Sequence, residues 1–132
     1  MEMEFNIGEL RHPSDCERIY PKDVLEKAVQ NYNGKTYKFG ELGHPTTQNI
    51  ELYKVSHVAE DVKIEDENFK VNVELLGTEK GKIATEFLNA GGKLKIMPRM
   101  LVNTEKVKKG PGKHTGQEVV KEMDIISWDL VY

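Results

Sequence analysis

The sequence predicts an α+β domain, either a small β-barrel or a curled antiparallel sheet, with two main helices packed outside it. Three patterns carry this prediction. Apolar residues alternate over positions 69–75, as in a half-buried strand, and they recur at helical spacing over 24–32. A second helical stripe over 83–88 is soon followed by two glycines. With 132 residues the chain is long enough for one core and too short for two, so we expect a single domain over residues 1–132.

The first half of the chain is predicted to combine strands with one helix. Residues 4–10 have the pattern of a short strand. The following helix is expected to open at Pro21, because the first helical turn needs no backbone donor there. Asn33-Gly34 ends it with residues that tolerate a left-handed conformation, and the strand-rich segment 50–64 follows. The buried face of this helix is predicted to hold Val24, Leu25, Ala28, Val29 and Tyr32.

The second half is predicted to hold one helix and two strands. Thr78 can cap the helix, and Gly91-Gly92 stops it. Strands are expected at about 94–102 and 118–131, joined by a basic, glycine-rich hairpin loop at about 106–116 that we expect to be mobile. The predicted buried stripe of the helix consists of Ile83, Ala84, Phe87 and Leu88.

Composition argues against two classes of partner. The chain carries 19 Lys+Arg against 22 Asp+Glu, a formal net charge of −3, so we expect no general attraction to nucleic acid or to an anionic membrane. The single cysteine, Cys16, rules out an internal disulfide and fits a reducing compartment. The first residues are acidic where a signal peptide would be basic, and no apolar run reaches about 18 residues. A soluble protein without a targeting segment is therefore expected.

Neither a metal site nor a cofactor is predicted. The histidines lack the i, i+4 spacing of a helical zinc site, and none lies near a second cysteine. The loop sequence GPGKHTG lacks the G-x-x-x-x-G-K-[ST] frame that wraps phosphates, so a hairpin tip is the better interpretation. Its positive charge is either simply solvated or meets an acidic surface of a partner. The lysines concerned are Lys106, Lys108, Lys109 and Lys113.

Two histidines have competing interpretations. His57 lies in VSHVAED among apolar neighbours, which favours a hydrogen-bonded histidine in the core or at a sheet edge. His44 lies on the turn GELGHP, residues 40–45, where a side chain can face a groove. Either it acts as a general base or it serves only the turn. The spacing alone does not decide, because a base also needs a nucleophile and an orienting acid.

Four segments, taken in order, carry a resemblance to a known family. They are RIYPKDVLEKAVQNYN, FGELGHP, SHVAED and ISWDLV, and together they run from about Arg18 to Val131. This set resembles the prohead core proteases of tailed bacteriophages, distant relatives of herpesvirus assemblin. The resemblance implies an assemblin-like fold and descent from serine proteases that cut scaffold and capsid proteins inside the immature head.

The resemblance also assigns roles to individual residues. It places the family's catalytic histidine at His44, its arginine at Arg99 and its late acidic residue at Asp129. The family's serine pair falls on Met97 and Pro98. Neither side chain has an oxygen or a thiolate that could attack a carbonyl, and proline also lacks a backbone N–H for an oxyanion hole. The resemblance therefore implies a site without its nucleophile.

These observations predict a catalytically inactive prohead-protease homologue. We expect a structural phage head protein, a capsid decoration or cement protein or else a core component, that binds the major capsid protein or a scaffold protein. It would be assembled in the host cytoplasm and kept in the virion, and homo-oligomerisation stays open. Together with Arg99, the loop lysines are the residues expected to contact a partner.

Two alternatives stay open on the sequence. One is an active maturation protease in which Ser127, Thr104 or Cys16 replaces the missing serine. The other is a regulator that pairs with an active protease in place of one of its subunits.

Overall fold

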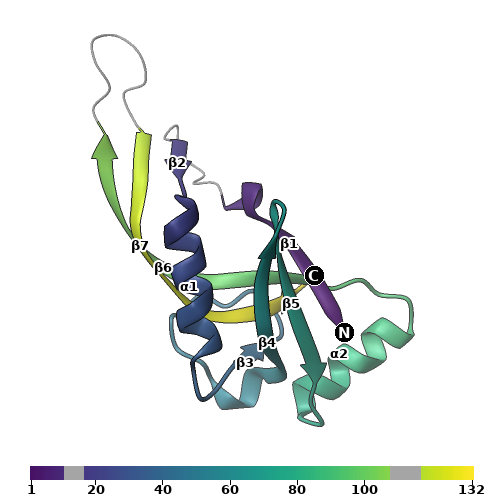
Figure 1. Ribbon diagram of the computed structural model, residues 1–132. Helices are drawn as coiled ribbons and strands as arrows, with labels where there is room; N and C mark the ends of the chain where they lie inside the picture. Colours follow the sequence, from purple (N-terminus) through teal and green to yellow (C-terminus); the bar gives the residue numbers. More distant parts are fainter. Residues whose placement is uncertain (11–16, 108–116) are drawn as a thin grey trace.

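The computed structural model describes residues 1–10, 17–107 and 117–132, and it has the predicted α+β composition (Figure 1). Two sheets and two α-helices surround one apolar core. In the described ranges both sheets are open and no barrel closes, so the barrel alternative is wrong and the curled sheet is nearer to the structure. Residues 108–116, which hold most of the predicted hairpin loop, lie outside the described ranges.

The first sheet is antiparallel throughout. Its strand order is β1 (Glu2–Asn6), β5 (Asn68–Leu75), β4 (Val55–Glu65) and β3 (Phe39–Glu41). The alternation over 69–75 is confirmed, because Phe69, Val71 and Val73 are buried. The strand predicted over 4–10 is shorter than expected and ends at Asn6. There the Asn6 side chain accepts a hydrogen bond of 2.8 Å from Gly8 N and turns the chain into a 3₁₀ helix, η1 (Ile7–Glu9).

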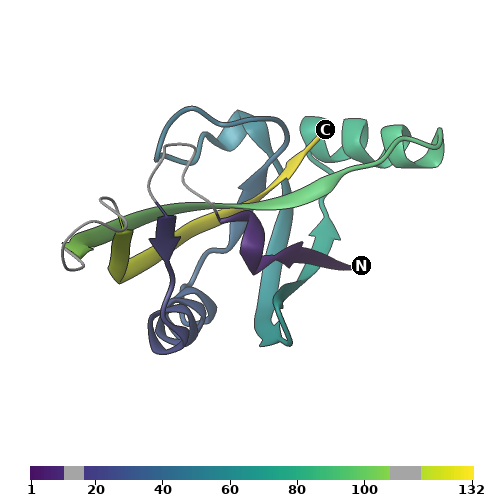
Figure 2. The ribbon, with the colours of Figure 1, turned by 90° about the horizontal axis from the view of Figure 1, so that it is seen from above.

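The second sheet is mixed, which corrects the purely antiparallel expectation. Its order is β2 (Glu17–Ile19), β7 (Gln117–Val131) and β6 (Lys95–Val107), with β2 parallel to β7 and β6 antiparallel to it. β6 is longer than the predicted strand, and the pairing continues to Val107 opposite Gln117. Register shifts after Arg99 and after Asn103 mark bulges, which bend and twist a long hairpin. Figure 2 shows this hairpin crossing the molecule, with the two helices on opposite sides of it.

The first helix, α1 (Lys22–Asn33), follows the prediction closely. Pro21 lies at its N-cap, and the buried side chains are Leu25, Ala28, Val29 and Tyr32. It packs against β7 and β4, and the Tyr32 hydroxyl donates a 2.6 Å hydrogen bond to Ala59 O. Asn33 fills a bulge in β4, since its side chain bonds both Val62 O, at 2.8 Å, and Val62 N, at 3.0 Å. Gly34 has φ −80°, so the expected left-handed ending is wrong.

The second helix, α2 (Glu79–Asn89), has the predicted cap and a different buried face. Thr78 accepts from Gly81 N at 3.1 Å and donates to Val55 O at 2.6 Å. The predicted buried stripe is confirmed at Ala84 and wrong at Ile83 and Phe87, which are 45% and 41% exposed. The helix packs through Ala84 and Gly81. A Cβ at Gly81 would fall on Leu76 O, so the backbones approach more closely than large side chains would allow.

The core converges on the C-terminal end of β7. The Trp128 ring is fully buried and packs edge-on against Phe69 and Phe5, with ring centroids 5.2 and 6.3 Å away. Neighbouring β7 residues alternate between this core and the opposite side of the strand, where Ser127 and Asp129 lie. This alternation places two polar side chains, both buried, next to β3 and β6.

Candidate functional site

A buried ion cluster joins β7, β6 and β3. Asp129 is 2% exposed, and its carboxylate meets the Arg99 guanidinium in a bidentate pair, with Nε–Oδ2 3.0 Å and Nη2–Oδ1 2.9 Å. The buried carboxylate of Glu41 lies 3.4 Å from the same Nη2. Two of the residues that the family resemblance selected, Arg99 and Asp129, are therefore in direct contact.

The remaining hydrogen-bonding capacity of Asp129 is used within the chain. The Ser127 hydroxyl lies 3.2 and 3.1 Å from the two carboxylate oxygens, and Glu41 N donates to Oδ1 at 2.9 Å. Asp129 thus accepts from three elements at once. A carboxylate held by this many donors fixes the local structure.

Arg99 makes four hydrogen bonds and a further ion pair inside the chain. Beyond the two carboxylates, Nη1 donates to Thr47 O at 3.2 Å and to Asn49 O at 2.9 Å. Burial lowers the pKa of Arg99, but the hydrogen bonds and charges of Asp129 and Glu41 outweigh burial and raise it overall. A guanidinium has five N–H groups, so most of the hydrogen-bonding capacity of Arg99 is used inside the chain.

His44 lies on the loop that follows β3, and Arg99 holds this loop through its bonds to Thr47 O and Asn49 O. The His44 side chain is exposed, and its Nε2 lies 3.1 Å from Tyr132 O, with the two rings edge-on at 5.8 Å. Gly43, with φ +115°, brings the loop beside β7 through a 2.8 Å bond from its N–H to Leu130 O. The structure therefore places His44 at the end of β7, bonded to Tyr132, and no hydrogen bond among the described residues joins it to Asp129.

The position assigned to the nucleophile lies directly beside the position assigned to the acid. Met97 is opposite Asp129 in the β6–β7 register, and Pro98 is opposite Trp128. Met97 is 45% exposed, so this point of β6 is open to solvent. What the structure presents there is a thioether and a proline ring, neither of which is a nucleophile for acyl transfer.

The proposed substitute nucleophiles are poorly placed or undescribed. Ser127 is fully buried and donates to Asp129. Thr104 pairs with Val120, seven positions along β6 from Met97, which is about 23 Å of strand. Cys16 lies outside the described residues. Within the described ranges no hydroxyl forms a hydrogen bond with His44.

A Ser–His pair, Ser56 with His57, is buried between the two sheets. His57 is fully buried, with Nδ1 2.7 Å from the Ser56 hydroxyl and Nε2 2.7 Å from Trp128 O. Because a carbonyl only accepts, Nε2 carries the proton and Nδ1 accepts from Ser56. Burial lowers the pKa of His57, partly offset by the bond to Trp128 and the charge of Asp129. This geometry agrees with the core interpretation of His57.

Comparison with known proteins adds one decisive likeness. The fold is similar to that of a capsid assembly protease. The solved structure of the bacteriophage T4 capsid assembly protease, gp21, superimposes with a TM-score of 0.74 and 20% sequence identity, covering 99% of this chain and 81% of that one. No family model and no curated protein matches the chain. At this identity the likeness establishes a prohead-protease-like fold and leaves activity to be argued from the site.

The other predicted contact residues are only partly described. Lys106 is exposed near the end of β6, whereas Lys108, Lys109 and Lys113 lie outside the described residues. Within the described ranges no group of three or more His, Cys, Asp or Glu side chains is arranged to hold a metal ion. No helix among those residues has the length and apolar character to cross a membrane.

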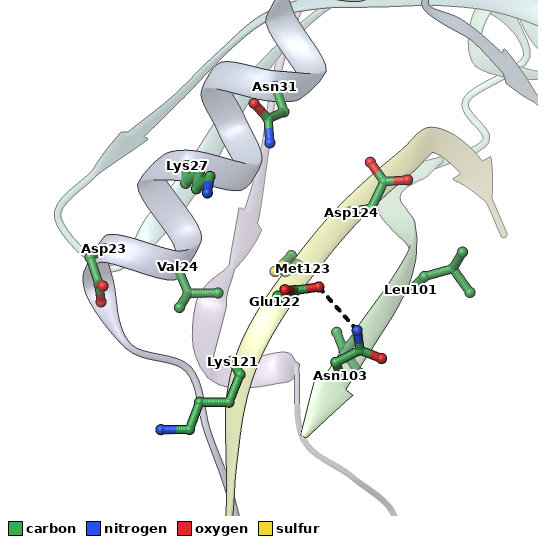
Figure 3. Close-up of a pocket in the computed structure, with 11 residues that line it drawn as sticks. Asp23, Val24, Lys27, Asn31, Leu101, Asn103, Lys121, Glu122, Met123 and Asp124 are labelled. Carbon is green, nitrogen blue, oxygen red and sulfur yellow. Dashed lines mark hydrogen bonds between the residues drawn. The ribbon is translucent and has the colours of Figure 1, made fainter. Parts of the chain in front are cut away.

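A broad groove of about 800 Å³ lies apart from this cluster, between α1 and the β6–β7 hairpin (Figure 3). Its walls include Asp23 and Lys27 on α1 and Leu101 on β6. Asn103 and Glu122 close one side through a 3.1 Å hydrogen bond across the hairpin. The groove is lined by polar and apolar side chains alike and contains none of the residues that the resemblance selected.

The sequence analysis did not predict the role of Glu41 or the hydrogen bonds by which Ser56 and His57 link β4 to β7. Glu41 and Gly40 both belong to the GELGHP motif, which drew attention only to its histidine. A Cβ at Gly40 would fall on His57 Nε2 and Trp128 O, so this glycine is required by close packing. The glycine before an acidic residue was the available signal, although its contacts lie 17 and 88 positions away in the chain.

Proposed function

We propose that this chain is a catalytically inactive relative of the capsid assembly proteases that serves as a structural component of a phage head. The observation that carries the proposal is the identity of the residue opposite Asp129 on β6. Met97 occupies it, and the Asp129 carboxylate is bound to Arg99 and Ser127. The protease-like fold is retained, while the side chains at this point have no acyl-transfer chemistry.

The chemical argument rests on what a general base can do. A histidine activates a hydroxyl or thiol within hydrogen-bond reach, and removing the nucleophile of a triad lowers turnover by roughly 10⁶-fold. His44 instead bonds Tyr132 O, and the buried hydroxyl of Ser127 is directed to Asp129. These contacts support a structural role for His44 at the end of β7.

The proposed partner is the major capsid protein or a scaffold protein. The similar T4 protein is named for capsid assembly, so a non-catalytic chain of this fold fits a decoration, cement or core component of the virion. Arg99 is largely buried and makes four hydrogen bonds and two ion pairs inside the chain. The contact is therefore proposed to use Lys106 and the loop lysines Lys108, Lys109 and Lys113, after assembly in the host cytoplasm.

A combined binding and cleavage assay tests this function. The purified chain is incubated with assembled major capsid protein and with scaffold protein, and co-sedimentation and mass spectrometry are read together. We expect binding without any cut. Cleavage that His44→Ala abolishes would instead establish an active protease with a non-standard nucleophile.

Charge variants test the proposed contact residues in the same assay. Changing the four lysines to glutamine is expected to weaken capsid binding at low salt. The matched control changes four exposed lysines elsewhere and should bind as the wild type does; these are Lys22, Lys27, Lys63 and Lys82. Equal losses in the two sets would show that net charge, and not this loop, determines binding.

A further inference from the structure

One long strand edge has no partner strand among the residues that the structure describes. β6 has 13 residues and pairs only with β7 among the described strands. It is therefore the edge strand of its sheet, on the side of β7 away from β2 (Figure 1). The other edge strands are short: β1 has five residues, and β2 and β3 have three each. Short edges are one of the devices by which proteins avoid pairing with other chains, and β6 does not use it.

The protection of this edge is also uneven along its length. Charged residues and proline on an edge strand oppose pairing with another chain. Lys95 and Pro98 lie near the beginning of β6, and Glu105 and Lys106 lie near its end. Residues 100–104, Met-Leu-Val-Asn-Thr, have neither a charge nor a proline. This window is about 17 Å long, and Leu101 within it is 43% exposed. None of its residues has a hydrogen bond beyond those to β7 and Glu122 among the described contacts.

We propose that the outer edge of β6 pairs antiparallel with β6 of a second copy of this chain. A two-fold axis at Val102 sets the whole uncharged window opposite itself, with Leu101 facing Asn103 of the other copy. In the same register Glu105 lies opposite Arg99, and Lys106 lies opposite Pro98. Between positions 97 and 107, the part of this register in which both partners lie in β6, no like charges face each other, so a chain of net charge −3 can approach its copy here without direct repulsion.

The resulting assembly has a defined architecture and strength. Isologous pairing joins the two three-stranded sheets into one six-stranded sheet, because each copy contributes the same edge to the contact. A contact built on about five residue pairs is smaller than the roughly 1,200 Å² of a standard interface, so we expect a dissociation constant in the micromolar range. Many copies bound close together on one surface would raise the effective concentration.

Sedimentation velocity of the intact chain between about 1 and 500 µM tests the proposal. The wild type is expected to shift from monomer to dimer across this range. The double variant Leu101→Lys, Asn103→Lys sets like charges opposite each other and should weaken dimerisation at least about tenfold. Gln30→Lys, Gln48→Lys adds the same charge on exposed positions away from the edge and should dimerise as the wild type does.

Cross-linking tests the register independently. In a Cys16→Ser background, a tagged Leu101→Cys chain and an untagged Asn103→Cys chain should form a mixed disulfide under mild oxidation, because directly opposite Cβ atoms lie about 4.5–5.5 Å apart. Gln30→Cys is the control and should form little.

Three results would overturn the proposal. They are a monomer at every concentration, a dimer insensitive to the lysines, and equal cross-linking at Gln30. Self-association does not depend on the proposed head function. Capsid binding that is lost in Leu101→Lys, Asn103→Lys while the wild-type chain stays monomeric would assign the edge to a capsid strand instead.

Discussion

The two ends of the β6–β7 hairpin are built in opposite ways. At one end Ser127, Trp128, Asp129 and Leu130 are almost fully buried, and Asp129 is bound to Arg99 of the neighbouring strand. At the other end the side chains of β6 from Asn103 to Lys106 are exposed, and the Lys121–Glu105 ion pair, at 3.5 Å, is on the surface. A single pair of strands therefore combines a buried ion cluster at one end with solvent-exposed side chains at the other.

Under the proposed function, this difference explains how a protease-like fold is retained without its chemistry. The residues at the buried end hold loops and sheets together, so stability constrains them even when no reaction uses them. The exposed end has no such constraint and is free to contact other chains. Variants that affect one end and spare the other test this division.

The largest expected effect is from Arg99→Met. Among the described residues, Arg99 is the one cation paired with the buried carboxylates of Asp129 and Glu41, so its loss should lower the free energy of unfolding by about 3–5 kcal/mol. Urea denaturation measures this directly. Lys121→Met, which breaks the surface pair at the other end, should cost less than about 1 kcal/mol. Equal losses would contradict the division between the two ends.

Gly40→Ala tests the close packing of the two sheets at Gly40, His57 and Trp128. The new Cβ would fall on His57 Nε2 and Trp128 O, so repacking should cost about 1–3 kcal/mol of unfolding free energy. Gly34→Ala is the matched control, because its φ of −80° suits alanine and only ordinary contacts surround it. That variant should be neutral or more stable by up to about 1 kcal/mol. A Gly40 variant as stable as the control would refute the close packing.

The pH dependence of stability tests the buried imidazole of His57. Its pKa is lowered in the folded state by burial, so the unfolded chain binds the proton more readily. Stability is then fully present above the unfolded pKa of about 6.5 and decreases as the pH falls below it, by up to about 1.4 kcal/mol per pH unit. Thermal or urea unfolding between pH 7.5 and 5 should show this slope. His57→Gln should be less stable at pH 7.5 and nearly flat over the same range; an unchanged slope would assign it to other groups.

The smallest difference concerns two hydroxyls on the same hairpin. Ser127→Ala removes the buried donor to Asp129 and should cost about 1–2 kcal/mol. Thr104→Ala, at the exposed end, should change stability by no more than about 0.5 kcal/mol. Chemical denaturation of both variants side by side is sufficient. A neutral Ser127 variant would show that this hydroxyl adds nothing to the cluster.

Local patterns predicted the elements better than the contacts between them. The stripe of α1, the Thr78 cap and the alternation of β5 were all readable, because each depends on neighbours within a few positions. The stripe predicted for α2 is wrong for its large apolar residues. Size and spacing predict that they are buried, but Gly81 brings the helix backbone against Leu76 and leaves Ile83 exposed.

The candidate site could be predicted only in part for the same reason. The family resemblance selected Arg99 and Asp129. It did not predict that the two residues bind each other, because they lie 30 positions apart in the chain. Glu41 reaches the same cluster from 88 positions away and had no local signal. The bulge after Arg99, which shifts the strand register beside the cluster, depends on a pairing that no short window of sequence contains.

The most direct test of the central claim is the copy number of this chain in purified mature virions, measured by quantitative mass spectrometry against the major capsid protein. A structural head component should be present at a high and fixed ratio to the capsid protein. Absence from the particle, or recovery only as cleaved fragments, would contradict that account and favour a protease that is removed during maturation.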